Sequence, residues 1–245
     1  MGQRRHMRVA IVTGAGRGIG AAVARRLYAD GWSLVLGDID ADAVTLLAAE
    51  LGRDAAPVLL DVRDPVAWDH AVAIASEAGD LASLVNVAAR TDIRDLFEIT
   101  PEEWDDVLAT NLRGPFLGIR VVGPLLRDRG DGRIVNIASD SAFRGRGVTG
   151  THYATSKAGL LALTRRAAAA LAPSGVTVNA VAPGTIDGET VRELAGERIE
   201  ELASEIPAGR LGRPEEVAAL VAWLLSDEAA YVNGATMLVD GGAAL

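Results

Sequence analysis

Seven short apolar stretches, rich in β-branched residues, alternate along the chain with segments of helical periodicity. Strands that are apolar on both faces need cover on both faces, and their regular alternation with helices is typical of a parallel sheet. The pattern therefore predicts one α/β domain spanning residues 1–245, a doubly wound parallel sheet with helices on both faces. The predicted strands are Arg8–Thr13, Ser33–Gly37, Ala56–Leu60, Leu84–Val87, Arg133–Ala138, Thr177–Ala182 and Thr236–Val239.

Three segments stand apart from this alternation. Gly184–Gly212 is long, charged and without a strand pattern, so we expect a substrate-binding loop or lid there. Thr151–Ala172 reads as a helix that is rich in Ala and Leu nearly all round, which suggests burial by another subunit. Residues 1–7 precede the first strand and are expected to be a leader, because Met7 could itself be a start.

Composition excludes several classes of function. The chain has no cysteine and only three histidines, so disulfides, thiolate catalysis and Cys-ligated metals are excluded and no metal is expected. A net charge of −9 argues against binding to nucleic acid, which requires a basic surface. No apolar run is long enough to span a membrane or form a signal peptide, and a cytoplasmic protein is therefore expected.

A glycine-rich segment follows the first predicted strand. It carries Gly14, Gly18 and Gly20 and opens a helix. Such a turn lets backbone N–H groups approach a pyrophosphate, and the helix N-terminus favours negative charge. A merely flexible turn is the alternative, but the position between a strand and a helix favours dinucleotide binding.

Asp38 ends the second predicted strand, 18 residues beyond Gly20. A carboxylate there can accept hydrogen bonds from the adenosine ribose and repel a 2′-phosphate, which favours NAD over NADP. Asp38 could instead cap the next helix, although Asp40 and Asp42 compete for that position. Arg17 points the other way, since a basic residue in the glycine loop could pair with a 2′-phosphate.

Tyr153 and Lys157 lie four residues apart and therefore share one face of a helix. The phenol of a free tyrosine has a pKa of about 10, and a neighbouring ammonium would bring that pKa toward neutrality. This spacing alone is common by chance. Upstream, however, Ser139 ends a predicted strand and Asn111 stands in Ala109-Thr-Asn-Leu112.

With these residues in order, the chain resembles the classical short-chain dehydrogenase/reductase family from Arg8 to Gly242. The motifs that carry the resemblance are the Thr13–Gly20 loop, Asp61-Val62, Asn86, Asn111, Ser139, Tyr153 with Lys157, Pro183-Gly184 and Val239-Asp-Gly-Gly242. The resemblance implies a Rossmann-type sheet of seven strands and a nicotinamide cofactor.

The resemblance also implies roles for four catalytic residues. Tyr153 would exchange a proton with the substrate oxygen, and Ser139 would hydrogen-bond that oxygen. Lys157 would hold the nicotinamide ribose and lower the pKa of Tyr153. Asn111 would position a water that links Lys157 to solvent.

The implied cofactor contacts run along the ends of the strands. Asp61 and Val62 would contact adenine, Asn86 would lie along the cofactor, and the backbone near Ile186 would touch the nicotinamide carboxamide. The full set is Gly14, Arg17, Gly18, Ile19, Gly20, Asp38, Asp61, Val62, Asn86, Ala88, Tyr153, Lys157, Pro183, Gly184 and Ile186.

Individual assignments keep alternatives. Asn111 could be an amide that only bends a helix or bridges strands, and Asp61 could be only an N-cap. The spacing from Ser139 to Tyr153 is one residue longer than the commonest form in the family, so Ser141 is a second candidate for the active serine.

The sequence therefore predicts an oxidoreductase that transfers hydride between NAD(H) and a small-molecule alcohol or carbonyl. One alternative is a 3-oxoacyl-thioester reductase that uses NADPH, and another is a non-catalytic dinucleotide sensor. The resemblance implies a homotetramer or homodimer, with the Thr151–Ala172 helix and the apolar C-terminal segment as candidate contact surfaces.

Overall fold

The computed structural model describes residues 7–145 and 149–245. Most of the predicted leader lies outside the described residues. Met7 is described, and its carbonyl oxygen accepts a hydrogen bond from the Asp80 amide at 3.1 Å. Met7 is therefore part of the folded domain, because it continues the line of the first strand.

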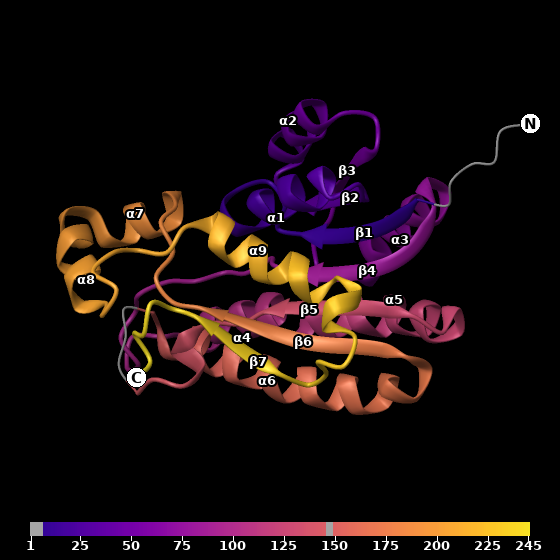
Figure 1. Ribbon diagram of the computed structural model, residues 1–245. Coiled ribbons are helices and arrows are strands. Elements are labelled where there is room, and N and C mark those ends of the chain that lie inside the picture. The colour runs from indigo at the N-terminus through magenta and orange to yellow at the C-terminus, as the bar shows by residue number, and fades with distance from the viewer. Residues whose placement is uncertain (1–6, 146–148) are drawn as a thin grey trace, which may run out of the picture.

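All seven predicted strands are present in one parallel sheet of order β3-β2-β1-β4-β5-β6-β7 (Figure 1). The prediction of Leu84–Val87 was wrong at its start, because the strand begins at Asp80. Ala82 and Ser83 interrupt the apolar run but are buried between neighbouring strands. The strands are β1 Arg8–Thr13, β2 Ser33–Asp38, β3 Ala55–Leu59, β4 Asp80–Asn86, β5 Gly132–Ile137, β6 Val176–Pro183 and β7 Thr236–Val239.

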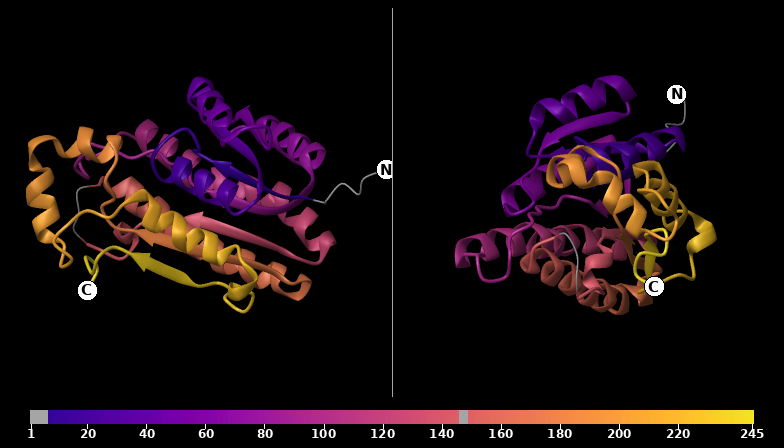
Figure 2. Two further views of the ribbon diagram at one scale, coloured as in Figure 1. Left: turned by 45° about the horizontal axis from the view of Figure 1, so that its top comes forward. Right: turned by 90° about the vertical axis from the view of Figure 1, so that its left-hand side faces the viewer.

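Helices cover both faces of the sheet, as predicted. Helices α1 and α9 pack against each other on one face, and α3, α5 and α6 pack on the other (Figures 1 and 2). The α-helices are α1 Gly18–Ala29, α2 Ala41–Leu51, α3 Pro65–Ala78, α4 Pro101–Leu108, α5 Gly114–Arg129, α6 Thr151–Leu171, α7 Glu189–Ala195, α8 Ile199–Glu205 and α9 Pro214–Leu224. A π-helical turn, Ala109–Arg113, joins α4 to α5, and 3-10 turns occupy Asp140–Ala142, Ala172–Ser174, Gly196–Arg198 and Asp227–Ala229.

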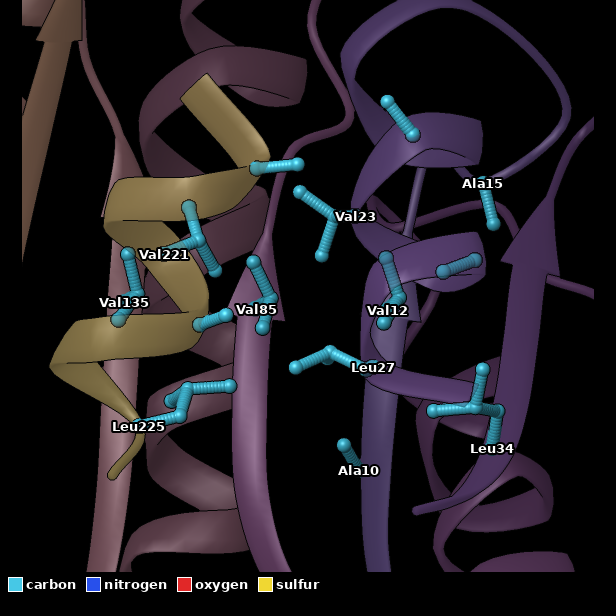
Figure 3. Close-up of a cluster of buried hydrophobic side chains, with 14 of the residues drawn as sticks. Ala10, Val12, Ala15, Val23, Leu27, Leu34, Val85, Val135, Val221 and Leu225 are labelled. Atoms are coloured by element: carbon cyan, nitrogen blue, oxygen red, sulfur yellow. The ribbon is translucent and has the colours of Figure 1, made fainter. Parts of the chain in front are cut away.

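The core between the sheet and the α1/α9 layer is built from small branched side chains. Val221 of α9 and Leu225, the residue that follows α9, face Val85 and Val135 of the central strands, and Leu27 of α1 packs beside them (Figure 3). These side chains are buried. Burying each contributes about 1.5–3 kcal/mol, which fixes the strand ends against the helices.

The segment Gly184–Gly212 is more regular than predicted. It contains α7 and α8, which project beyond the edge toward which the strands point (Figure 1). A parallel bridge between Ile186 and Gly212 closes its base, and Leu202 is buried. The sequence pattern missed these helices because each has only seven residues, about two turns.

Several of the apolar side chains of helix α6 are buried within this chain. Leu160, Leu161 and Leu171 are buried against the sheet face and its neighbours, whereas Arg165 and Arg166 are exposed. The predicted cover by another subunit is therefore not needed for these leucines. Across residues 7–145 and 149–245, no helix is both long and apolar enough to cross a membrane.

Candidate active site

The carboxyl ends of the parallel strands meet at one edge of the sheet. Between β1 and β4 the strand order reverses, and this is where a crevice forms in open α/β sheets. The Thr13 hydroxyl oxygen accepts hydrogen bonds from the amides of Val87 at 3.1 Å and Ala88 at 3.2 Å. One side chain thus holds the chain leaving β1 against the chain leaving β4.

The glycine loop lies against the place where the chains leaving β1 and β4 meet. Gly14 has φ +63° and Gly18 φ +52°, a left-handed conformation that suits glycine. A Cβ on Gly14 would lie 2.7 Å from the Ala88 Cα, and one on Gly20 would collide with the Gly14 carbonyl. The glycines are required for this close approach, and helix α1 begins at Gly18 with its N-terminal amides at the crevice.

Asp38 is fixed beside the loop. Its Oδ2 accepts a hydrogen bond from the Gly16 amide at 2.9 Å, and its Oδ1 accepts one from the Asp40 amide at 3.1 Å. Asp40, not Asp38, caps α2 by accepting from the Ala43 amide. The alternative that Asp38 is only the helix cap is therefore wrong, and its carboxylate is held at the strand end.

Arg17 of the glycine loop is turned toward the lid. Its Nη1 lies 3.5 Å from Oε2 of Glu189, the first residue of α7. Both side chains are about two-thirds exposed, at 69% and 66%, so this ion pair is weak. The contact connects the loop with the segment that carries α7 and directs the Arg17 guanidinium to that side.

Asp61 and Val62, the predicted adenine contacts, follow β3. The Asp61 carboxylate accepts bidentate hydrogen bonds from the Arg63 guanidinium, which also pairs with Asp106 at 2.6 Å. The bond from Arg63 lowers the pKa of Asp61. Asp64 supplies the N-cap of α3, so Asp61 is not that cap. Val62 is buried, and its carbonyl accepts from the indole N–H of Trp68.

The Asn86 side chain points into the interior. Its Nδ2 donates to Asn136 Oδ1 at 2.8 Å, and Asn136 in turn donates to the Thr164 hydroxyl at 2.9 Å. This buried network joins β4, β5 and α6. The predicted contact of Asn86 with the cofactor is therefore left to its backbone, together with the backbone of Ala88.

At the end of β6, the chain passes closely over β7. The Gly184 amide donates to the Val239 carbonyl at 3.0 Å, and a Cβ on Gly184 would lie 2.9 Å from the Asp240 Cα. Beyond Pro183-Gly184, the bridge to Gly212 uses the Thr185 carbonyl and the Asp187 amide. The peptide groups of Ile186 point the opposite way, because successive residues alternate in an extended chain.

Ser139 lies beside Tyr153, and a hydrogen bond from its side chain acts to lower the pKa of the phenol. Ser139 is buried at the end of β5, and its Oγ also lies 3.1 Å from Ser141 Oγ. Ser141 in turn accepts from the Thr149 hydroxyl. The structure thus pairs Ser139 with the tyrosine and gives Ser141 a supporting position.

Lys157 lies beneath the tyrosine ring. Its Nζ is 5.6 Å from the ring centroid of Tyr153 and donates to the Ile137 carbonyl at 2.7 Å. Burial lowers the pKa of Lys157 to about 7. Burial also raises the pKa of Tyr153 to about 12, against the hydrogen bond from Ser139. The predicted lowering of the Tyr153 pKa was wrong in this structure, because burial of the phenol is the largest influence on that pKa and raises it.

Asn111 sits buried in the π-helical turn and holds the chain after β4. Its Oδ1 accepts from the Arg90 amide at 2.7 Å, and its Nδ2 donates to the Arg90 carbonyl at 2.8 Å and to Ser156 Oγ at 3.0 Å. These bonds fit the bridging alternative for Asn111. They place it next to the Lys157 turn of α6, while its predicted role with a water stays a prediction.

The family described as enoyl-(acyl carrier protein) reductase matches residues 14–244. The chain belongs to the classical short-chain dehydrogenase/reductase family. It is an oxidoreductase that interconverts alcohol and carbonyl groups with a nicotinamide cofactor.

Two relatives illustrate the range of this dehydrogenase/reductase family. The 3-oxoacyl-[acyl-carrier-protein] reductase FabG of Escherichia coli (strain K12) is 36% identical over 236 residues, 96% of each chain. Galactitol 2-dehydrogenase of Agrobacterium fabrum is 36% identical over 253 residues, 98% of each chain. An acyl-carrier reductase and a polyol dehydrogenase thus match this chain equally well in identity.

Solved structures in the family share the fold closely. A 3-ketoacyl-(acyl-carrier-protein) reductase from Brucella melitensis complexed with NADH has a TM-score of 0.90 and 29% identity, covering 97% of this chain and 98% of that one. A variant of actinorhodin polyketide ketoreductase with NADPH has a TM-score of 0.92 and 34% identity, covering 97% of each.

Sequence reasoning missed two buried polar pairs of this dehydrogenase/reductase. Buried His152 lies with its Nε2 3.0 Å from Asp92 Oδ2 and joins the start of α6 to the chain after β4. Asp140 is buried beside Ser139 and pairs with Arg144 at 2.7 Å. The spacing of Asp140 and Arg144, four residues apart, was a visible signal, but burial of the carboxylate was not.

Lys157 is the only lysine in the chain, so isotope-labelled lysine gives one side-chain signal in NMR spectra. In nucleotide-free protein we expect this signal to titrate with a midpoint near pH 7 rather than the usual 10.5, because burial disfavours the ammonium. A midpoint above pH 10 would contradict the burial argument.

The same shift affects stability. Between about pH 7 and 10.5 the unfolded chain binds the proton that the native Lys157 has lost, so the free energy of unfolding rises with pH in this window. The slope is up to about 1.4 kcal/mol per pH unit. The matched Lys157→Met variant lacks this contribution, and the difference from wild type, measured by urea unfolding, checks it.

Proposed function

We propose that this enzyme transfers hydride between NAD(H) and a small alcohol or carbonyl, with Tyr153 as the acid/base. The observation that carries the proposal is the arrangement of Ser139, Tyr153 and Lys157 at the carboxyl edge of the sheet. Ser139 lies beside Tyr153, and the Lys157 ammonium lies below the ring. No group other than these is needed to move one proton to or from a substrate oxygen.

Each side chain has a separate task. Tyr153 Oη gives its proton to a carbonyl oxygen during reduction and takes it back during alcohol oxidation. Ser139 hydrogen-bonds the same oxygen and holds it near Tyr153. Lys157 would hold the ribose hydroxyls next to the nicotinamide, which would supply or accept the hydride when bound. The Asn111 side-chain amide bonds the backbone of Arg90 and the Ser156 hydroxyl, and so holds the chain after β4 against α6.

The glycine loop suits a dinucleotide, because glycines let the backbone approach the pyrophosphate closely. Gly14, Gly18, Ile19 and Gly20 present the start of α1 to the pyrophosphate. Asp38 would accept from the adenosine ribose, and Asp61 with Val62 would border the adenine. The remaining proposed contacts are the backbone of Asn86 and Ala88, the side chains of Arg17, Tyr153 and Lys157, and the backbone of Pro183, Gly184 and Ile186.

Two features favour NAD over NADP. The Asp38 carboxylate is anchored by the Gly16 amide, so it cannot swing away from a 2′-phosphate, which it would repel. Arg17, the cation that could pair with that phosphate, is directed toward Glu189.

A 3-oxoacyl-thioester reductase that uses NADPH is the second candidate, favoured by the 36% identity to FabG. NADH bound to a 3-ketoacyl-(acyl-carrier-protein) reductase of Brucella melitensis separates the two questions of substrate and cofactor. An assay panel of secondary alcohols, polyols and 3-oxoacyl thioesters with each cofactor distinguishes the candidates.

The proposed assembly is a homotetramer or homodimer. A groove beside α4, the π turn, α5 and α6 has an apolar part formed by Leu108, Leu112, Phe116 and Leu163, with Phe116 47% exposed, next to the charged Arg63, Asp105, Asp106 and Arg113. Burying this apolar surface against a second copy favours association. Light scattering should give a mass above that of one chain, and a monomer at assay concentration would contradict the assembly.

Tyr153→Phe tests the catalytic proposal. Removing the hydroxyl should lower turnover by at least about a hundredfold, because the proton has no other donor near the substrate oxygen. NADH binding, followed by fluorescence, should persist. Tyr231→Phe is the matched control, since Tyr231 is fully exposed and should keep wild-type turnover. Wild-type turnover of Tyr153→Phe would refute the proposal, and NADH binding without any turnover in wild type would favour a sensor.

Asp38→Ser tests the cofactor proposal. The variant should bind NADH more weakly and NADPH more tightly, and the ratio of the two Kd values should change by about tenfold or more, or 1.4 kcal/mol. Asp42→Ser removes an equal charge from the exposed side of α2 and should leave the ratio unchanged. Tighter binding of NADPH than NADH by wild type would overturn the NAD preference.

A further inference from the structure

A buried carboxylate lies directly behind the proposed catalytic serine. Asp140 opens the 3-10 turn after β5 and is only 6% exposed. Its Oδ1 lies 3.3 Å from Ser139 Oγ, and its Oδ2 lies 2.7 Å from Arg144 Nη1. A buried aspartate needs partners of this kind, because an unpaired carboxylate away from water is costly.

The Ser139 hydroxyl stands between Asp140 and the phenol of Tyr153. Its single proton can be donated to Asp140 or to Ser141 Oγ at 3.1 Å, and its oxygen accepts from the Ser141 amide at 3.2 Å. When that proton points toward Asp140, the lone pairs of Ser139 face Tyr153. Ser139 then cannot donate to a phenolate at Tyr153, so the bond that would lower the pKa of the phenol is weakened.

The negative charge of Asp140 also favours the neutral form of the Tyr153 phenol. The negative Asp140 disfavours a second negative charge on Tyr153 and contributes to the raised pKa of the phenol, after burial and against the Ser139 bond. Arg144 partly offsets this effect, because it pairs with Asp140 but its side chain is 37% exposed to solvent. The Asp140–Arg144 pair therefore leaves a net negative influence on the inner side.

Two other titratable groups of the described residues lie near the tyrosine. Lys157 of α6 lies below the ring, and burial lowers its pKa to about 7, so at alkaline pH it no longer favours the phenolate. His152, the preceding residue, is turned to Asp92. Asp140 with its partner Arg144 is thus the charged group that distinguishes the serine side of the site.

We propose that Asp140 is a positioning residue that orients the Ser139 hydroxyl and keeps Tyr153 protonated, so that the site works as a proton donor to carbonyls across neutral pH. This inference rests on the proposed function and deepens it toward carbonyl reduction. Hydride adds to the carbonyl carbon, the C=O π pair moves to oxygen, and that oxygen takes the Tyr153 proton. Alcohol oxidation needs the phenolate as a base and is therefore confined to alkaline pH.

Two variants with opposite charge changes test this role. Asp140→Asn keeps the shape and removes the negative charge, so the alkaline limb of alcohol oxidation should move to lower pH by about one unit, a tenfold gain in rate on that limb. Arg144→Gln removes the offsetting positive charge and should move the limb to higher pH. Asp140→Glu should restore the wild-type position. If Asp140 had only a structural role, the variants would change KM or stability, and the alkaline limb would stay at its wild-type pH in both.

A second readout needs no substrate. Tyrosinate absorbance is titrated in wild type and in Tyr153→Phe, and the difference isolates Tyr153 among the three tyrosines. At one alkaline pH where circular dichroism shows an intact fold, Asp140→Asn should ionise more Tyr153 than wild type, and Arg144→Gln less. Equal ionisation in all three proteins, or shifts of the same sign in both variants, would overturn the proposal.

The two readouts separate this inference from the proposed function. If Tyr153→Phe kept full turnover while the absorbance shifts appeared with the expected signs, Asp140 would still control the tyrosine but the tyrosine would not be the acid/base. If turnover depended on Tyr153 but neither readout moved, the function would stand and the role of Asp140 would fall.

Discussion

The site depends on parallel strands that end together at one edge of the sheet. Because β1, β4, β5 and β6 are held in parallel register, the residues that follow them lie close together at this edge. The Thr13 hydroxyl strengthens this meeting by binding the amides of Val87 and Ala88. Lys157 depends on the same edge, since its ammonium donates to the carbonyl of Ile137, the last residue of β5.

Burial is the second constraint, and it opposes the charges that catalysis uses. The core that fixes the strand ends also removes water from Tyr153 and Lys157, which raises the pKa of the phenol and lowers that of the ammonium. The protein balances this with polar neighbours: Ser139 against the phenol, the Ile137 carbonyl against the ammonium, and the Asp140–Arg144 pair behind the serine. The ionisation state of the site thus follows from packing as much as from the reactive residues themselves.

The sequence predicted the sheet well because buried parallel strands are continuous apolar runs. It placed β1 and β7 at their observed bounds and failed at the start of β4, where Ala82 and Ser83 are buried despite a weak pattern. It also missed α7 and α8, since helices of seven residues leave little periodicity. Local pattern therefore suffices where one element buries a long apolar face and fails where burial depends on neighbours.

In the candidate site, too, some features could be predicted from the sequence and others depended on neighbouring residues. Order along the chain was enough to bring Ser139 and Tyr153 together, and to separate Asp38 from the helix cap at Asp40. Side-chain direction was not predictable: Asn86 faces the interior network rather than the crevice. The effect of burial on the pKa values of Tyr153 and Lys157 was not predictable either, because it depends on every residue that excludes water.

Hydrogen–deuterium exchange with and without NADH tests most directly whether the dinucleotide binds along the carboxyl edge of the sheet. We predict protection by NADH in the segments that follow the strands: residues 14–20, 38–40, 87–90, 138–141 and 184–188. The opposite edge, with residues 30–32, 79 and 130–131, should exchange unchanged. Protection at that opposite edge, or NADH binding without protection of the glycine loop, would contradict the account.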